Sequence, residues 1–259
     1  MRRSVRILAI GNSFSEDAMT YLWDILRDGG MEEVVLGNLY IGGCSLELHA
    51  QNIREGAATY VYMKNTDGIW RHTPQTTLAE GLADEAWDII TLQQASHDSG
   101  LPETYASQGE ILEFVRRNKR NPEAALYWHM TWAYQGDSTH PGFARYGGDR
   151  DTMYAAILHA VETEILPTGA YTGVIPSGMA IRHLRATPVG DTVTRDGFHM
   201  SESHGRYAVA LTWAQTLCGM DPSAVTWLPE AFAEAIRPDL GHIRDAVKAV
   251  DGAFFSKCP

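Results

Sequence analysis

Short apolar runs alternate with segments of helical spacing along most of the chain. The candidate strands are residues 5–10, 33–41, 88–93, 124–129 and 171–175. The candidate helices, in which apolar side chains recur every three or four positions, are residues 15–28, 103–118, 149–166, 178–185, 202–217 and 229–250. This alternation predicts an α/β fold in which a parallel sheet is covered by helices on both faces.

Residues 60–70 break this alternation. Asp67 and Gly68 lie between two short β-prone runs, and this pair suits a tight turn with positive φ. The segment is therefore predicted to be a β-hairpin insertion, at the sheet edge or over the mouth of the site. No repeat, low-complexity tract or long linker divides the chain, so we expect residues 1–259 to form a single domain.

Composition and charge narrow the range of partners. Hydrophobic residues make up 44% of the 259 positions, which is enough for a sizeable core, and the formal net charge is −11. This charge repels phosphate backbones and anionic lipid headgroups. We therefore expect neither a nucleic acid nor a membrane as a partner, while the pattern defines no oligomeric state.

The cysteines and the apolar runs bear on the compartment. Cys44, Cys218 and Cys258 are too widely spaced for a disulfide framework or a zinc cluster, which favours a reducing compartment. The apolar run at residues 7–10 is short for a signal peptide, and no run approaches the ~20 residues of a membrane helix. These features predict a soluble, cytoplasmic protein.

A candidate nucleophile follows the first strand, which runs directly into Gly11-Asn12-Ser13-Phe14-Ser15 and a helix. A serine hydroxyl placed there lies beside the free N–H groups and the positive dipole end of the helix, a position that favours a developing anion. Ser13 could therefore attack a carbonyl group. The alternative is that Ser13 and Ser15 only cap the helix.

A candidate base lies far downstream, in the segment from Arg195 to Ser201. Asp196 and His199 are three residues apart just before a helix, so the carboxylate can approach the imidazole. In that arrangement Asp196 would fix the tautomer of His199 while the imidazole takes a proton. Solvated turn residues and a metal-binding Asp-x-x-His are the alternatives.

The two segments together resemble the first and last sequence blocks of the SGNH, or GDSL-like, hydrolase superfamily. The double Gln at 93–94 adds a similarity to an uncharacterised bacterial branch with G-N-S-F-S and D-G-x-H-x-S motifs. The resemblance implies a flavodoxin-like, three-layer α/β/α fold with a doubly wound parallel sheet. It also implies a serine esterase, without cofactor or metal, in which Ser13 is the nucleophile, His199 the base and Asp196 its orienting carboxylate.

The oxyanion hole is expected at the ends of two further strands. Gly43, with Gly42 as the second choice, follows the second strand, where a missing side chain lets the backbone N–H approach closely. Gln94 stands where the superfamily usually has Asn, and offers the same amide donor. Together with the N–H of Ser13, these groups would hold the oxyanion. The alternative for Gln93 and Gln94 is an amide at a strand end that bonds a neighbouring loop.

The substrate is expected to contact side chains beyond the third and fourth strands. His129 and Trp132 come from an aromatic segment after the fourth strand, whereas Trp128 inside that strand is interpreted as core. Gln93 and His97 are further candidates. Because flat aromatic faces suit the apolar faces of sugars, we expect a small-molecule or oligosaccharide ester, above all an O-acetylated carbohydrate.

Two alternatives belong to other classes. A metal-dependent hydrolase would use side chains grouped at the strand ends: His97, Asp98, His129, Asp196 and His199. No spacing typical of a metalloprotease supports it. A carbohydrate-binding protein that has kept a hydrolase fold without catalysis would use the aromatic segment instead. Transfer of the acyl group to an acceptor other than water remains a variant of the esterase.

Overall fold

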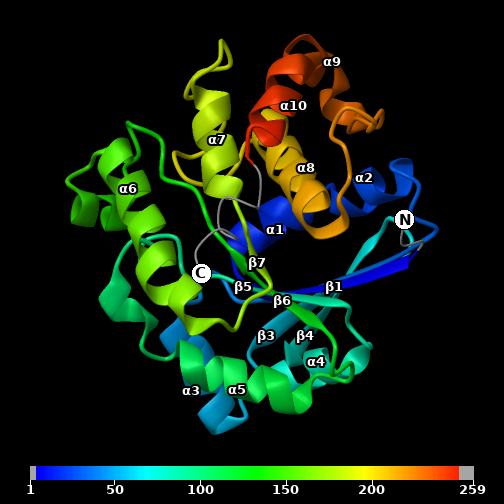
Figure 1. Cartoon of the computed structure of the whole chain (residues 1–259), viewed down its shortest axis with the longest axis vertical. Coiled ribbons are helices and arrows are strands. Elements are labelled where there is room, and N and C mark those ends of the chain that lie inside the picture. The colour runs from blue at the N-terminus through cyan, green and yellow to red at the C-terminus, as the bar shows by residue number, and fades with distance from the viewer. Residues whose placement is uncertain (1–3, 251–259) are drawn as a thin grey trace.

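A computed structural model describes residues 4–250, which are built around one mixed β-sheet (Figure 1). Within these residues the sheet has seven strands in the order β4-β3-β2-β1-β5-β6-β7. The strands are β1 (Ser4–Gly11), β2 (Glu33–Tyr40), β3 (Tyr60–Asn65), β4 (Trp70–Thr76), β5 (Ile89–Leu92), β6 (Ala125–His129) and β7 (Gly173–Ile175).

The five strands predicted from apolar runs form the parallel part of the sheet. β1 pairs in parallel with both β2 and β5, and β6 and β7 continue outward from β5. Strand order therefore reverses beside β1, and the carboxyl ends of β1, β2 and β5 lie side by side at the edge where open α/β sheets bind ligands. The predicted doubly wound arrangement is confirmed.

The predicted hairpin is also confirmed. β3 and β4 are antiparallel to each other, and β3 pairs antiparallel with β2, so the hairpin extends the sheet at one edge. Gly68 in its turn has φ of +91°, a conformation that favours glycine. The second strand is longer than expected and ends at Thr76.

Helices cover both faces of the sheet, as expected. In Figure 1, α1, α2, α7, α8 and α10 lie on one side and α3, α4 and α5 on the other. No helix in residues 4–250 combines the length and apolarity needed to cross a bilayer. The helices are α1 (Ser13–Met19), α2 (Leu22–Asp28), α3 (Leu46–Glu55), α4 (Leu78–Asp84), α5 (Gln108–Asn118), α6 (Arg150–Ala160), α7 (Ser177–Arg185), α8 (His204–Cys218), α9 (Ala233–Ile236) and α10 (Leu240–Lys248).

The helix boundaries depart from the prediction in three regions. The first expected helix is two helices, α1 and α2, and the last is broken where Pro238 interrupts the hydrogen-bond pattern between α9 and α10. Residues 161–165 continue α6 as a π-helix. α3 and α4 were not predicted. Both are short, and each begins at a side-chain cap, Ser45 for α3 and a capping box of Thr77 and Glu80 for α4.

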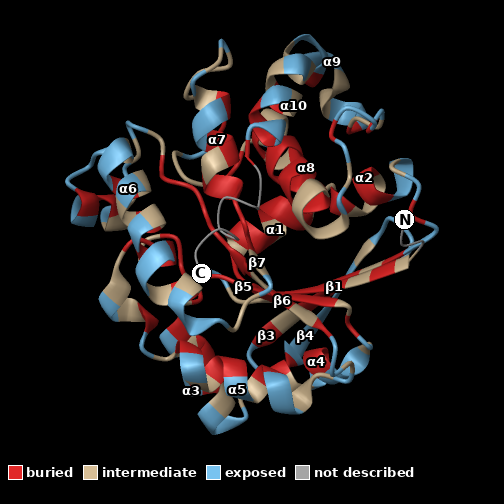
Figure 2. Cartoon of the chain, viewed as in Figure 1, coloured by how far each residue is buried: buried red, intermediate tan, exposed pale blue. Residues whose placement is uncertain are grey.

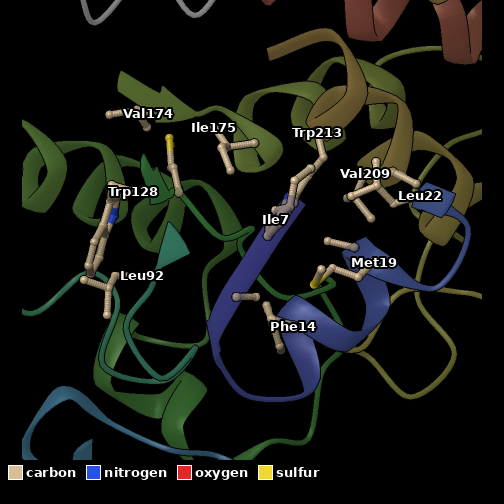
Figure 3. Packing of buried hydrophobic residues seen from close by; sticks show 14 of the residues in the cluster. Ile7, Phe14, Met19, Leu22, Leu92, Trp128, Val174, Ile175, Val209 and Trp213 are labelled. Carbon is tan, nitrogen blue, oxygen red and sulfur yellow. The ribbon is translucent and has the colours of Figure 1, made fainter. Parts of the chain in front are cut away.

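The core fills the space between the sheet and both helical layers (Figure 2). Phe14 and Met19 of α1 and Trp213 of α8 pack over β1 on one face (Figure 3). Trp128 of β6 is 2% exposed, so its interpretation as a core residue is confirmed. This packing holds the amino end of α1 rigidly above the end of β1, where the candidate nucleophile lies.

Candidate active site

Ser13 is the first residue of α1, immediately after β1 and the N-cap residue Asn12. The Asn12 side chain accepts a hydrogen bond from the Phe14 N–H at 3.0 Å, which caps the helix. Ser13 therefore does not cap the helix, which was the alternative interpretation of this residue. A Cβ at Gly11 would lie 2.6 Å from the Ser15 hydroxyl, so the strand can turn into the helix this tightly only with glycine there.

The structure brings Ser13, His199 and Asp196 into one hydrogen-bonded chain. The Ser13 hydroxyl lies 2.8 Å from His199 Nε2, and His199 Nδ1 lies 2.6 Å from Asp196 Oδ2. Because a carboxylate only accepts hydrogen bonds, Nδ1 carries the proton and Nε2 is left as the acceptor for the serine proton. The arrangement has the contacts of a Ser-His-Asp triad.

The loop around His199 is shaped by Asp196. Its second carboxylate oxygen accepts hydrogen bonds from the N–H groups of His199 at 2.8 Å and Phe198 at 3.2 Å. Partial burial raises the pKa of Asp196, but these bonds and the His199 side chain outweigh it, so the pKa lies below its ordinary value. The carboxylate therefore stays ionised beside His199.

Asp17 ties this loop to the helix that carries Ser13, and sequence reasoning missed it. Its fully buried carboxylate accepts hydrogen bonds from Arg195 at 2.9 Å, Arg206 at 2.8 Å and the Met200 N–H at 2.8 Å. Asp17 lies one helical turn after Ser13. The helix that carries Ser13 thus holds residues on both sides of His199 in the sequence. The only sequence signal for this role was the acidic residue that follows G-N-S-F-S-E.

Trp132 holds the same loop from the opposite side. Its indole N–H donates to the Phe198 carbonyl at 2.7 Å, and its ring stacks on Phe14 with centroids 4.2 Å apart. The side chain is fully buried. The expectation that Trp132 contacts substrate is therefore wrong: it holds the loop of His199 from within the core.

Gln93 and His129 are also internal, which corrects their predicted roles in substrate binding. Gln93 Nε2 donates to Asn12 Oδ1 at 2.7 Å, and Gln93 Oε1 lies 2.8 Å from His129 Nδ1, from which it accepts. His129 Nε2 lies 2.9 Å from the Ser177 hydroxyl. Gln93 is 2% exposed and His129 1%. These hydrogen bonds hold the N-cap residue of α1 in place, so the role of Gln93 and His129 is structural.

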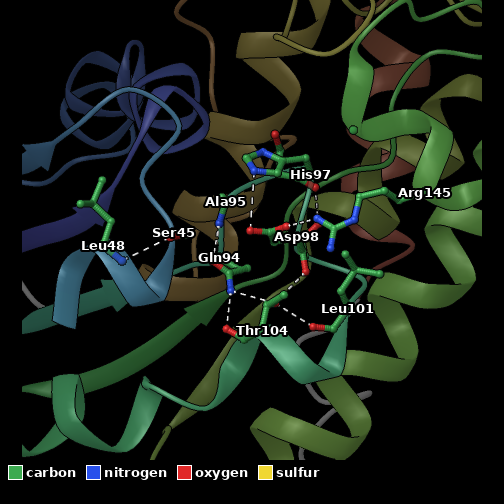
Figure 4. Close-up of polar contacts among 12 residues, drawn as sticks. Ser45, Leu48, Gln94, Ala95, His97, Asp98, Leu101, Thr104 and Arg145 are labelled. Atoms are coloured by element: carbon green, nitrogen blue, oxygen red, sulfur yellow. Dashed lines mark hydrogen bonds and ion pairs between the residues drawn. The ribbon is translucent and has the colours of Figure 1, made fainter. Parts of the chain in front are cut away.

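Gln94 has no amide hydrogen left for an oxyanion (Figure 4). Its Nε2 donates to both the carbonyl and the hydroxyl of Thr104, at 3.0 and 3.1 Å, and its Oε1 accepts from the N–H groups of Leu46 and Ala95. The predicted oxyanion role is therefore corrected. The alternative interpretation, a strand-end amide bonded to neighbouring loops, describes Gln94, which joins the start of α3 to the segment after β5.

Gly43 lies in the exposed turn after β2 with φ of +63°. The turn is held against the end of β1 that precedes Ser13, since the Ile41 N–H donates to the Gly11 carbonyl at 3.3 Å and Asn12 Nδ2 donates to the Cys44 carbonyl at 3.1 Å. No hydrogen bond within residues 4–250 engages the Gly43 N–H. Its role in an oxyanion hole stays a prediction.

Aromatic and imidazole side chains form a row of successive contacts that begins at His199. Phe198 lies 4.1 Å from the His199 ring, His140 lies 4.7 Å from Phe198, and His97 stacks on His140 at 5.9 Å. Burial lowers the pKa of His140, and the nearby His97 and His199 lower it further. His97 thus stays a candidate substrate contact. His140 was missed because its partners are distant in sequence.

The metal-dependent alternative finds no support in the arrangement of these groups. Within residues 4–250, no three His, Cys, Asp or Glu side chains are placed to hold a metal ion together. His129 is enclosed by Gln93 and Ser177, and Asp98 pairs with Arg145 at 2.5 Å. The five residues considered as metal ligands therefore bond to different partners and do not converge on one point.

The buried His129 predicts an acid-sensitive fold. Burial lowers its pKa from 6.5 to about 3, so between these values the unfolded chain binds a proton that the folded protein excludes. This contribution to stability is complete above pH 6.5 and is lost as the pH falls, by about 1.4 kcal/mol per unit. In urea titrations from pH 7 to 4, His129→Gln should flatten this loss and the exposed His183→Gln should not. Equal slopes in all three proteins would contradict it.

A family model and a solved structure each match this chain over most of its length. A sequence model of a domain of unknown function, DUF4886, matches residues 6–237. The crystal structure of a DUF4886 family protein from Bacteroides uniformis ATCC 8492 is 38% identical, with a TM-score of 0.89, and the alignment covers 97% of this chain and 95% of that one. No protein with curated annotation matches the chain.

More distant structures share the fold. An SGNH hydrolase candidate from Slackia heliotrinireducens is 23% identical with a TM-score of 0.54, over 83% of this chain and 99% of that one. A catalytic mutant of Axe2, an acetylxylan esterase from Geobacillus stearothermophilus, is 11% identical with a TM-score of 0.53, over 83% and 94%. The seven-stranded α/β architecture is thus that of SGNH hydrolases, as the sequence motifs predicted.

Proposed function

We propose that this chain, which belongs to the DUF4886 family, is a serine esterase that uses Ser13, His199 and Asp196. The observation that carries the proposal is the unbroken hydrogen-bonded chain from the Ser13 hydroxyl through His199 to the ionised Asp196. Three residues from two ends of the sequence meet with the contacts of a catalytic triad, at the sheet edge where open α/β folds bind ligands.

The chemistry needs only groups of this chain and water. His199 Nε2 takes the proton of Ser13 while the serine oxygen attacks the ester carbonyl, and the same nitrogen then gives the proton to the departing alcohol. In the second half, His199 takes a proton from water, the resulting hydroxide attacks the acyl group on Ser13, and the proton returns to the serine. Asp196 stabilises the imidazolium formed in each half.

The oxyanion of each tetrahedral intermediate is held by backbone N–H groups. The N–H of Ser13, at the first position of α1, has no acceptor within the helix, and the N–H of Gly43 has no partner among residues 4–250. Each such donor is typically worth ~3 kcal/mol of transition-state stabilisation. The Gln94 amide is not part of this set, because Thr104 occupies both of its hydrogens.

Replacing Gly43 with alanine tests this role against a matched control. Gly43 and Gly190 have φ of +63° and +67°, and in both a Cβ would meet open space. Alanine at either position should lower stability by about 1 kcal/mol, the strain of positive φ. Only Gly43→Ala should lower kcat, by about tenfold or more, because the strained turn shifts an oxyanion donor. Equal kcat in the two variants would remove Gly43 from the proposed hole.

The proposed substrates are O-acylated carbohydrates and related small esters. The direct test is hydrolysis of p-nitrophenyl acetate combined with labelling by a fluorophosphonate, which reacts with an activated serine. We expect turnover of the ester and a single label, mapped by mass spectrometry to the peptide containing Ser13. A purified, folded protein that neither hydrolyses esters nor takes the label would favour the non-catalytic binding alternative.

A further inference from the structure

His140 comes from the segment after β6, and the fold holds it against the loop of His199. Its ring makes an edge contact with Phe198, with the ring centroids 4.7 Å apart, and Phe198 in turn lies 4.1 Å from the His199 ring. The Gln135 N–H donates to the Gly197 carbonyl at 2.8 Å, which ties the segment that carries His140 to the same loop. One aromatic ring therefore separates His140 from the proposed base.

The orientation of the His140 ring leaves one N–H donor open to solvent. The Gly142 N–H donates to His140 Nδ1 at 3.0 Å. A backbone N–H only donates, so Nδ1 is the acceptor and the proton of the neutral ring lies on Nε2. His140 Nε2 makes no hydrogen bond within residues 4–250 and is not one of the buried atoms that lack a partner there, so it remains accessible. Burial, together with the nearby His97 and His199, lowers the pKa of His140 and keeps the ring neutral at pH 7.

Glycine at position 142 allows a second imidazole to lie beside the first. A Cβ there would overlap the His97 Cβ and lie 3.1 Å from His140 Nδ1, so a larger residue would push the two rings apart. The His97 ring stacks on His140 with centroids 5.9 Å apart, and the His97 side chain is 35% exposed. Phe198, His140 and His97 thus follow one another away from His199. We call these three side chains the His140 row.

The carboxylates at the two ends of the His140 row are paired, which favours a neutral ligand. Asp98, next to His97, forms an ion pair with Arg145 at 2.5 Å (Figure 4), and Asp196 is bonded to His199. The row therefore offers neutral N–H groups and ring faces. Hydroxyl groups accept from such donors, and the carbons of a sugar ring form an apolar face that suits an aromatic side chain. These groups fit a ring that carries several hydroxyls.

The mechanism decides which part of an ester would meet the His140 row. His199 Nε2 gives its proton to the oxygen of the departing alcohol, so that oxygen comes within hydrogen-bond reach of the His199 ring. The acyl carbonyl, by contrast, is held by N–H groups at the start of α1 and in the turn after β2. Because the row packs on His199 through Phe198, it borders the alcohol side of the reacting bond.

We propose that the His140 row is the subsite for the alcohol part of the ester, where His140 Nε2 donates to a hydroxyl of a sugar ring. This inference rests on the proposed esterase function and names the side chains that select the sugar. The same subsite should accept a free sugar once the acyl group is on Ser13, because this step is the reverse of acylation. The sugar hydroxyl attacks the acyl carbon and gives its proton to His199, the bond from that carbon to the Ser13 oxygen breaks, and the serine oxygen takes the proton from His199.

Partition of the acetyl-enzyme between water and added alcohols tests this subsite. With p-nitrophenyl acetate as donor, at least one of methyl β-xyloside, xylobiose and methyl β-glucoside should yield an acetylated sugar, detected by mass spectrometry. His140→Asn keeps an acceptor for the Gly142 N–H but removes the Nε2 donor. It should lower the ratio of transfer to hydrolysis about tenfold, as expected for one lost hydrogen bond. His140→Gln, whose amide can place an N–H near the same point, should restore part of that ratio.

Methanol and the exposed His159 provide the matched controls. Methanol is too small to reach His140 from the acyl carbon, so its share of acetyl transfer should be the same in the wild type and in His140→Asn. His159→Asn, at the end of α6, should match the wild type with every acceptor. Ester turnover with no acetylated sugar, or with a ratio that His140→Asn leaves unchanged, would overturn the subsite alone. A folded protein without ester turnover would overturn the proposed esterase and the subsite with it.

Discussion

Ser13→Ala is expected to lower kcat for p-nitrophenyl acetate by about four to six orders of magnitude, the range found when a triad serine is removed. The reason is that no other hydroxyl lies on His199 Nε2 among the described residues. Within residues 4–250 the half-buried Ser13 side chain bonds only His199, so the variant should keep its stability. Activity is measured by single-turnover and steady-state hydrolysis, and stability by thermal unfolding.

The exposed Ser223→Ala is a control for this substitution, since Ser223 lies in a turn far along the chain and its side chain touches no triad residue. It should retain wild-type kcat and label fully with the fluorophosphonate, whereas Ser13→Ala should not label. Turnover retained in a folded Ser13→Ala protein would exclude Ser13 as the nucleophile and with it the esterase mechanism.

Asp17→Asn is expected to have the largest effect among residues that do not touch the substrate. The substitution keeps the shape but removes the buried charge that faces Arg195 and Arg206. Breaking a buried charge pair by removing one partner typically costs about 3–5 kcal/mol of unfolding free energy. Because these contacts hold the loop of His199, a shift of about 1 Å there should also lower kcat up to about a hundredfold.

A positioning role for Asp17 predicts more than instability. At a temperature where the variant is fully folded, kcat should fall while KM stays near the wild-type value, since the substrate itself is not contacted. Asp151→Asn is the matched control: its pair with Arg182 at 2.8 Å is exposed, so stability should change by less than ~1 kcal/mol and kcat not at all. Wild-type kcat in folded Asp17→Asn would show that the loop does not depend on this anchor.

Most of the fold was predictable because the strands of a buried parallel sheet are marked by their own side chains. Every predicted strand, including the hairpin around Gly68, is present at nearly the expected bounds. The helices were less so. α3 and α4 are short and depend on caps and packing, and the break of the first helix after Met19 has no local signal as strong as proline or glycine.

The residues of the candidate site were likewise predicted only in part. Ser13, Asp196 and His199 were predicted to act together because the segments that carry them resemble the first and last sequence blocks of the SGNH superfamily, whereas their local contexts alone left a helix cap and a solvated turn open. The contacts of Gln94, His129 and Trp132 were predicted wrongly. Each carries a polar group near a strand end, and whether its side chain faces solvent or the interior depends on partners such as Thr104, Ser177 and Phe198.

By itself, the sequence determined the five parallel strands, the inserted hairpin and the place of Ser13 between a strand end and a helix. Apolar periodicity and turn chemistry act over a few residues and can therefore be recognised in one dimension. Only the tertiary structure decided that the buried Asp17 anchors the loop of His199, that Gln94 is a structural clamp, and that His140 packs against Phe198. Burial and hydrogen-bond partners are properties of side chains brought together from distant positions, and local patterns do not encode them.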